Sequence, residues 1–206
     1  MRRVAESFTW PFRAAVTTWI WGCVMVLLSP LLFIPLLGYA VAATRDAAQP
    51  PLFRWSRRLL LDGFWVAVAL AVSVLPFALL LGPLATAAGG IAPNSLVAYA
   101  AAFFVLALPW GLVVLLVLPH ATAAFARTGR ARDLFDVAAA VRGVTREFGT
   151  WNAVLAAIVT AWAIGLACAG LLCVGIVPGV FYAILVSAHA VASLHPEAAS
   201  QGPSAG

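Results

Sequence analysis

The chain has 206 residues, of which 64% are hydrophobic and 9% are charged, and its mean hydropathy is +1.04. Soluble domains carry about 25% charged residues, so this composition excludes an ordinary soluble protein. The net charge of +5 comes from twelve basic residues, all arginine, against seven acidic ones. Because the arginines flank apolar runs, they point to anionic lipid headgroups as their partner and not to nucleic acid.

The charges are confined to short segments of the chain. They fall within residues 1–13, 45–62 and 127–147 and at Glu197, and none lies in the runs 14–44, 63–126 and 148–196. An ionised group in hydrocarbon costs several kcal/mol, so uncharged runs of this length indicate segments that lie in lipid. We therefore predict an all-α integral membrane bundle, folded as one domain over 1–195 and followed by a disordered tail at 196–206.

The N-terminal part of the chain is predicted to form a surface helix and then a broken apolar one. Residues 5–14 carry Trp10, Phe12 and Arg13 and suit the membrane interface. The hydrophobic segment 17–42 is long for one crossing and short for two, and prolines interrupt its second half. A single crossing and a re-entrant hairpin that returns near Ser29–Pro35 both fit, and the hairpin is favoured because it keeps all twelve arginines on one side.

Each of the two later uncharged runs has room for two crossings of about 20 residues. In the first run, the connector 86–95 contains Gly-Gly and Pro-Asn pairs, which are typical of turns. In the second run, Gly175 and Pro178 interrupt the helical pattern. We therefore predict about four full spans, near residues 63–85, 96–118, 151–173 and 178–194.

The basic segments are predicted to face the cytoplasm and to lie at the membrane surface. The positive-inside rule places 45–62, 127–147 and the C-terminus of a multi-pass cell-membrane protein on the cytoplasmic side. Residues 52–62 and 132–148 combine apolar stripes with charges and predict interfacial helices. These helices could bind lipid headgroups specifically, or they could simply anchor the protein at the membrane interface. The candidate headgroup contacts are Arg54, Arg57, Arg58, Arg142 and Arg146.

Small residues recur at four-residue steps along the predicted third full span. Such a ridge allows two helix backbones to approach closely in a membrane. It could serve a homo-oligomer or pack within the chain against another span. The ridge comprises Ala153, Ala157, Ala161, Gly165 and Ala169.

Polar chemistry within the apolar runs is sparse. His189 and Tyr182 in the last span and His120 at the end of an earlier one are candidates for buried polar positions. An isolated histidine in a membrane helix can equally be a structural hydrogen-bonding group. The sequence offers no pattern for a catalytic, metal or cofactor site, so we expect neither an enzyme nor a bound cofactor. No carboxylate lies in the uncharged runs, whereas ion-coupled carriers usually hold one.

These features favour a non-enzymatic membrane scaffold, organiser or accessory subunit that acts through lipid contact and helix packing. The alternative is a small oligomeric transporter or channel without intramembrane charges. The sequence identifies no protein partner, and homo-oligomerisation is compatible with either function.

The order of short motifs along the chain resembles a known family. The motifs are Trp10-Pro11-Phe12, Pro35-Leu36-Leu37-Gly38-Tyr39, Pro50-Pro51, Leu61-Asp62-Gly63-Phe64, Thr128-Gly129-Arg130, Leu134-Phe135-Asp136 and Ser187-Ala188-His189. Over about 8–195 they are similar to the polytopic membrane family catalogued as domain of unknown function 4013. Ala190-Val191 stands here where that family has Gly-Gln. The resemblance implies a membrane fold, with Gly38-Tyr39 and Asp62-Gly63 at turns or caps, and it carries no assigned activity.

Overall fold

The computed structural model describes residues 2–46, 48–88, 96–168 and 175–194, and every regular element in these ranges is helical. The expected tail at 196–206 lies outside the described residues, as does most of the connector 86–95. The elements are α1 (Arg2–Glu6), η1 (Trp10–Arg13), α2 (Val16–Leu27), α3 (Ser29–Arg45), α4 (Arg57–Ala88), α5 (Leu96–Thr128), η2 (Ala131–Leu134), α6 (Val137–Arg146), α7 (Phe148–Ala167) and α8 (Ile176–Ala192). The predicted all-α fold is confirmed.

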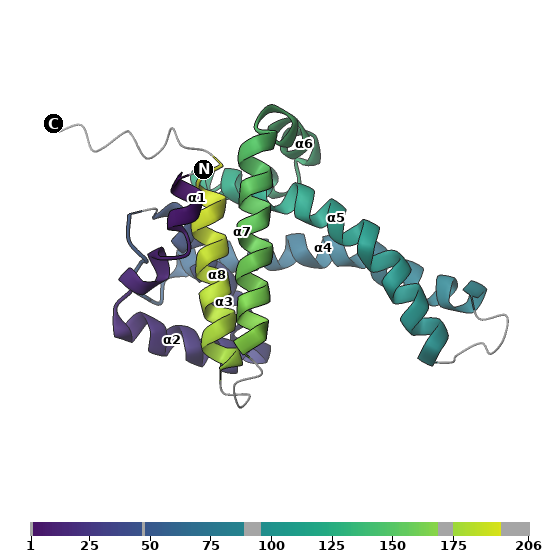
Figure 1. Cartoon of the computed structure of the whole chain (residues 1–206), viewed down its shortest axis with the longest axis horizontal. Helices are drawn as coiled ribbons and strands as arrows, with labels where there is room; N and C mark the ends of the chain where they lie inside the picture. Colours follow the sequence, from purple (N-terminus) through teal and green to yellow (C-terminus); the bar gives the residue numbers. More distant parts are fainter. Residues whose placement is uncertain (1, 47, 89–95, 169–174, 195–206) are drawn as a thin grey trace.

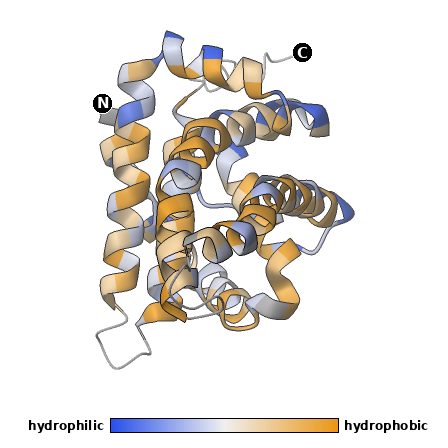
Figure 2. Ribbon diagram, turned by 90° about the vertical axis from the view of Figure 1, so that its right-hand side faces the viewer, coloured by the Kyte–Doolittle hydropathy of each residue, from blue (hydrophilic) through white to orange (hydrophobic). Residues whose placement is uncertain are grey.

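Two helix pairs set the shape of the molecule. Helices α7 and α8 lie side by side, and α4 and α5 form a second pair that projects away from them (Figure 1). Helix α3 connects the two pairs by packing against both α4 and α8. Hydrophobic residues dominate most of the ribbon, and strongly hydrophilic residues are restricted to small patches (Figure 2).

Within the described ranges, three helices are long and apolar enough to cross a membrane, namely α4, α5 and α7. Helix α8, where a fourth full span is predicted, has 17 residues and is about 26 Å long at 1.5 Å per residue. The hydrocarbon core of a bilayer is about 30 Å thick, so α8 is slightly short for a full crossing.

The long helices α4 and α5 contain two prolines each and are joined by a side-chain hydrogen bond beside one of them. Pro76 lacks the N–H that a helix needs at this point and crowds the preceding turn, which weakens the backbone hydrogen bonds of that turn. Trp110 Nε1 of α5 donates to the Ser73 carbonyl of α4 at 2.7 Å. This bond gives a carbonyl in the disturbed turn a partner within the protein, as backbone groups in a membrane require.

The apolar segment 17–42 folds as two helices that meet at a break. Leu28 separates α2 from α3 with φ −95° and ψ 23°, and Leu32 adds a kink inside α3. The chain before the break and the chain after it return to the same end of the molecule. Ser7 lies against His189 near the end of α8, and Arg45 at the end of α3 reaches Ala126 near the end of α5.

Close approach of two glycines fixes the crossing of α3 and α4. A Cβ built on Gly38 would lie 1.9 Å from the Leu59 carbonyl oxygen, and one built on Gly63 would lie 1.9 Å from that of Ile34. The expectation that Gly38 and Gly63 occupy turns or caps is therefore wrong. Both lie inside helices, where the missing side chain lets α3 and α4 touch backbone to backbone.

The surface helices are shorter than the sequence predicts. Over 132–148 the chain forms η2, which ends at Leu134, and then the ten-residue α6, which Asp136 caps by accepting from the Ala139 N–H at 2.8 Å. Residues 5–14 form the end of α1 and the separate η1, whose first turn contains Pro11. In place of a separate helix at 52–62, α4 runs without interruption from Arg57, and Ser56 Oγ accepts from the Leu59 N–H.

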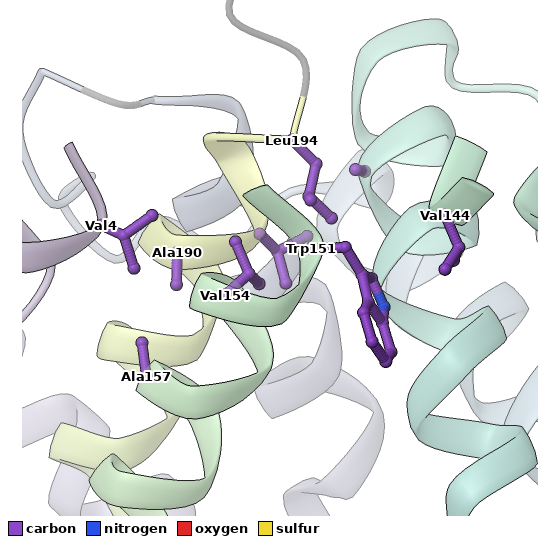
Figure 3. Packing of buried hydrophobic residues seen from close by; sticks show 9 residues of the cluster. Val4, Val144, Trp151, Val154, Ala157, Ala190 and Leu194 are labelled. Atoms are coloured by element: carbon purple, nitrogen blue, oxygen red, sulfur yellow. The ribbon is translucent and has the colours of Figure 1, made fainter. Parts of the chain in front are cut away.

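A hydrophobic core joins the N-terminal helix to the C-terminal ones. Val4 of α1, Val144 of α6, and Trp151 and Val154 of α7 pack with Leu194 after α8 (Figure 3). Together with the Arg45 contacts, this core gathers α1, the end of α3, the start of α4, the end of α5, and α6 at one end of the molecule. We call this the charged end, since it holds most of the ionisable side chains.

Candidate functional site

An ion pair joins three helices at the charged end. Arg45 Nη1 donates to Asp62 Oδ2, and Arg45 Nε donates to the Ala126 carbonyl at 2.6 Å. The side chain of Asp62 is 10% exposed and that of Arg45 is 21% exposed, so water screens the pair only partly. Arg45 Nη2 is also buried and has no hydrogen-bond partner among the described residues. The pair therefore fixes α3, α4 and α5 to one another where the charged and uncharged parts of the chain meet.

A cavity of about 190 Å³ opens beside this ion pair. Its polar lining comes from Arg45, Arg54, Ser56, Arg58 and Asp62. Tyr39, Pro51, Leu52 and Leu59 supply most of the remaining wall, and the Tyr39 hydroxyl is occupied because it donates to the Pro51 carbonyl at 3.1 Å. Three arginines face one carboxylate here. Such a set can hold an anionic group by charge and hydrogen bonding, and it contains no nucleophile–base pair.

The structure separates the five arginines that the sequence suggests as headgroup contacts. Arg54 and Arg58 line the cavity, and Arg58 Nε lies 4.0 Å from Asp62 Oδ2. Arg57, which precedes Arg58 in the sequence, is exposed and does not line the cavity. Arg142 and Arg146 are exposed on α6, outside the cavity. The charged end thus combines one concave arginine set with a more scattered one.

His189 and Tyr182, the predicted buried polar positions of the last helix, both hold the N-terminal segment. His189 Nδ1 is hydrogen-bonded to Ser7 Oγ at 2.8 Å, and its ring lies 4.8 Å from that of Trp10. The Tyr182 hydroxyl donates to the Phe8 carbonyl at 3.0 Å. Ser7 is fully buried, so a substrate has no path to its hydroxyl. These contacts attach the N-terminus to α8, and they have the character of structural hydrogen bonds.

His120 lies between α5 and α6 and is buried, with 3% of its surface exposed. A Cβ on Gly143 of α6 would lie 2.8 Å from His120 Nδ1, so the ring rests directly on the glycine backbone. This contact holds α6 against the end of α5. His120 and the pair His189 and Tyr182 are held on different elements and pack against different partners.

The ridge of small residues on α7 faces α8. Ala157 and Ala161 are buried, and a Cβ on Gly165 would lie 2.6 Å from the Gly179 carbonyl oxygen of α8. Ala153 packs against the core that contains Trp151, and Ala169 lies outside the described residues. The sequence allows the ridge to pack within the chain or in a homo-oligomer. In the described residues, the ridge packs within the chain.

Arg45, Asp62 and Tyr39 were not singled out as site residues by the sequence, although two of them leave a signal there. Asp62 is four residues after Arg58 on a helix, and Arg45 directly ends an apolar run. The sequence does not reveal that these positions meet, because their contact depends on the Gly38–Gly63 helix crossing.

Comparison with known families gives one match that covers most of the chain. The model described as "Protein of unknown function (DUF4013)" matches residues 22–187. No curated protein and no solved structure matches the chain. The matched region includes the arginine-lined cavity and the glycine crossing of α3 and α4, and it excludes Ser7 and His189. The chain therefore belongs to the DUF4013 family, a family of unknown function whose fold in this member is a helical bundle with membrane-compatible helices.

Proposed function

We propose that the protein is a non-enzymatic, multi-pass protein of the cell membrane that acts as a scaffold, organiser or accessory subunit. The observation that supports this is the apolar surface of the α4–α5 hairpin. Within the most apolar 18-residue windows of these helices, only 11% of α4 and 6% of α5 is buried inside the molecule. Soluble monomers rarely expose contiguous apolar patches of more than a few hundred Å², so lipid or other membrane helices would cover this hairpin.

The large side chains of the hairpin support a role in lateral contact. Leu79 is 66% exposed, Phe104 66% and Leu108 73%. A hairpin that contributes so little to the chain's own core leaves most of its packing surface for neighbours. Lipid would satisfy this surface non-specifically, whereas a partner helix would use the small residues between the large ones for close packing.

We also propose that the charged end faces the cytoplasm and that α2 and α3 form a re-entrant hairpin. The positive-inside rule supports the orientation, and the return of Ser7 and Arg45 to one end supports the hairpin. Labelling with an impermeant maleimide tests both, in a chain whose native cysteines are replaced by serine. Cysteines at exposed Glu6 and Thr145 should react from the cytoplasmic side, and one at exposed Thr86 from the other side. Labelling of Glu6 from the same side as Thr86 would reject the re-entrant hairpin.

Site-specific photo-crosslinking in native membranes tests the scaffold. A photoreactive amino acid at Leu108 should form a discrete protein adduct, because this side chain faces away from the molecule. The same probe at Val159 of α7, which is 54% exposed, controls for random collisions. Equal adducts at both positions, or none at Leu108, would contradict a partner-binding hairpin.

The second candidate is a small oligomeric transporter or channel, and the broken α2–α3 helix is the feature that favours it. Non-helical backbone such as that at Leu28 is tolerated at membrane depth where protein buries it or where it lines a water-filled path. Purified protein in liposomes distinguishes the two functions. A scaffold leaves ion and solute leakage at the level of empty vesicles, and a saturable flux would favour the channel.

A further inference from the structure

The charge in the arginine-lined cavity is unbalanced. Arg45, Arg54 and Arg58 contribute three positive charges against the single carboxylate of Asp62. Arg45 donates directly to that carboxylate, so this pair largely neutralises itself. Arg58 approaches the same oxygen only at 4.0 Å, and its side chain is 72% exposed. Arg54 and Arg58 are thus left at the mouth of the cavity with donors available for another acceptor.

The start of α4 adds to the positive potential of the cavity. Ser56, Arg58 and Leu59 line it and belong to the cap and first turn of this 32-residue helix. Ser56 Oγ accepts from the Leu59 N–H, and the start of a helix carries partial positive charge that favours an anion. Charge, hydrogen-bond donors and concavity therefore coincide at one place, a combination that the exposed arginines of α6 lack.

The volume of the cavity and its position along the chain fit a lipid phosphate. A space of about 190 Å³ holds roughly six water-sized groups of about 30 Å³ each, enough for one phosphate. Arg45 ends the apolar helix α3, and the 64 residues that follow Asp62 are uncharged. The cavity therefore lies at the boundary between the charged and apolar parts of the chain, the level at which headgroups meet acyl chains. Trp55, 55% exposed beside Arg54, is a residue typical of this level.

We propose that this cavity binds one anionic phosphate group, and that its source is the headgroup of a membrane phospholipid. Arg54 and Arg58 bind the phosphate oxygens, and the Arg45–Asp62 pair forms the fixed floor that positions the start of α4. The proposal rests on the membrane embedding proposed above, and it adds a specific site to the general lipid contact.

Native mass spectrometry of the full chain in a neutral detergent tests the site. The protein is titrated separately with phosphatidylglycerol, with phosphatidylcholine of the same acyl chains, and with inorganic phosphate. Wild-type protein should retain one phosphatidylglycerol preferentially. R54Q/R58Q should weaken that binding by about tenfold or more, since it removes the charged hydrogen-bond donors to the phosphate. R142Q/R146Q removes the same number of charges from exposed positions on α6. This variant should change phosphatidylglycerol binding by less than about twofold.

Each outcome decides between the possibilities. Equal losses of phosphatidylglycerol binding in the two double variants would show that net charge alone attracts the lipid, and would overturn the site. The absence of saturable binding would overturn it as well. Tight binding of inorganic phosphate that depends on Arg54 and Arg58 would keep the anion site and overturn the lipid source. Both variants change exposed side chains, so unchanged thermal unfolding verifies their fold. Because binding is measured in detergent, its failure leaves the crosslinking test of the scaffold unaffected.

Discussion

The substitution Gly38→Ala should separate α3 from α4. The added Cβ would lie 1.9 Å from the Leu59 carbonyl oxygen, 2.8 Å from its carbon and 3.2 Å from the Gly63 nitrogen. All three atoms belong to backbone, so no side chain can rotate out of the way. Ordinary contact begins near 3.4 Å, and relief of the closest overlap requires the helices to move apart by about 1.5 Å.

Such a displacement has a measurable cost. Overpacking a well-packed site destabilises proteins by about 1–3 kcal/mol, and the rigidity of both backbones places Gly38→Ala at the upper end of that range. For a chain of this size, 1 kcal/mol shifts Tm by about 2–4 °C, so a loss of about 5–10 °C is expected. Thermal unfolding of detergent-purified protein, followed by size-exclusion recovery, measures it. The Arg45–Asp62 contact depends on the same crossing, so phosphatidylglycerol binding should weaken as well.

Gly82→Ala is the matched control within α4. A Cβ at Gly82 meets nothing within 4 Å, and alanine is the better helix former by about 1 kcal/mol. Gly82→Ala should therefore leave Tm unchanged or raise it. If Gly38→Ala unfolds at the wild-type temperature, or if the two variants lose equal stability, then the backbone contact does not hold α3 to α4.

Three further substitutions test single contacts by thermal unfolding. Ser7→Ala removes the buried hydrogen bond to His189 and should cost about 1–2 kcal/mol and speed proteolysis of the N-terminal segment. Trp110→Phe removes the N–H donor to the α4 carbonyl and should cost about 1 kcal/mol. Arg45→Gln leaves the largely buried Asp62 without its closest partner and should cost about 3–5 kcal/mol, with partial recovery when Asp62→Asn is added.

Each of these substitutions has a control at an exposed position of the same residue type or chemistry. Thr9→Ala removes an exposed hydrogen bond to the Glu6 carbonyl, Trp55→Phe alters an exposed indole, and Arg146→Gln removes an exposed charge. All three should change stability by less than about 0.5 kcal/mol, as surface substitutions usually do. A control that is as destabilising as its counterpart, or strictly additive losses for Arg45→Gln and Asp62→Asn, would refute the corresponding contact.

Charge distribution and proline placement were sufficient to predict much of the architecture. The uncharged run 63–126 predicted two long apolar helices, which the structure has as α4 and α5. The prolines of the segment 17–42 indicated a broken helix. These features are local, since residues close in sequence determine whether a segment is apolar or interrupted. Helix boundaries were less well predicted, although Asp136 and Ser56 are local cap signals that each accept from the N–H three residues later.

The contacts that build the cavity could not be predicted in the same way. Gly38 and Gly63 look like turn residues in a sequence, and only the crossing of α3 and α4 shows that they provide close approach. Ser7 and His189 are separated by 182 positions, so no spacing rule connects them. Periodicity indicates which face of a helix is apolar, and the identity of the helix that covers it depends on the tertiary fold.

The length of α4 has a consequence for the area that the protein occupies in a bilayer. From Gly63 to Ala88 the helix is uncharged and about 39 Å long, against a hydrocarbon thickness of about 30 Å. Matching the two by inclination requires about 40° from the bilayer normal, the upper limit seen for membrane helices, and displaces the hairpin tip sideways by about 25 Å. Helix α4 runs across the direction of α7 (Figure 1), so an orientation that inclines α4 by this amount also inclines α7, and one copy of the chain has an elongated outline in the bilayer.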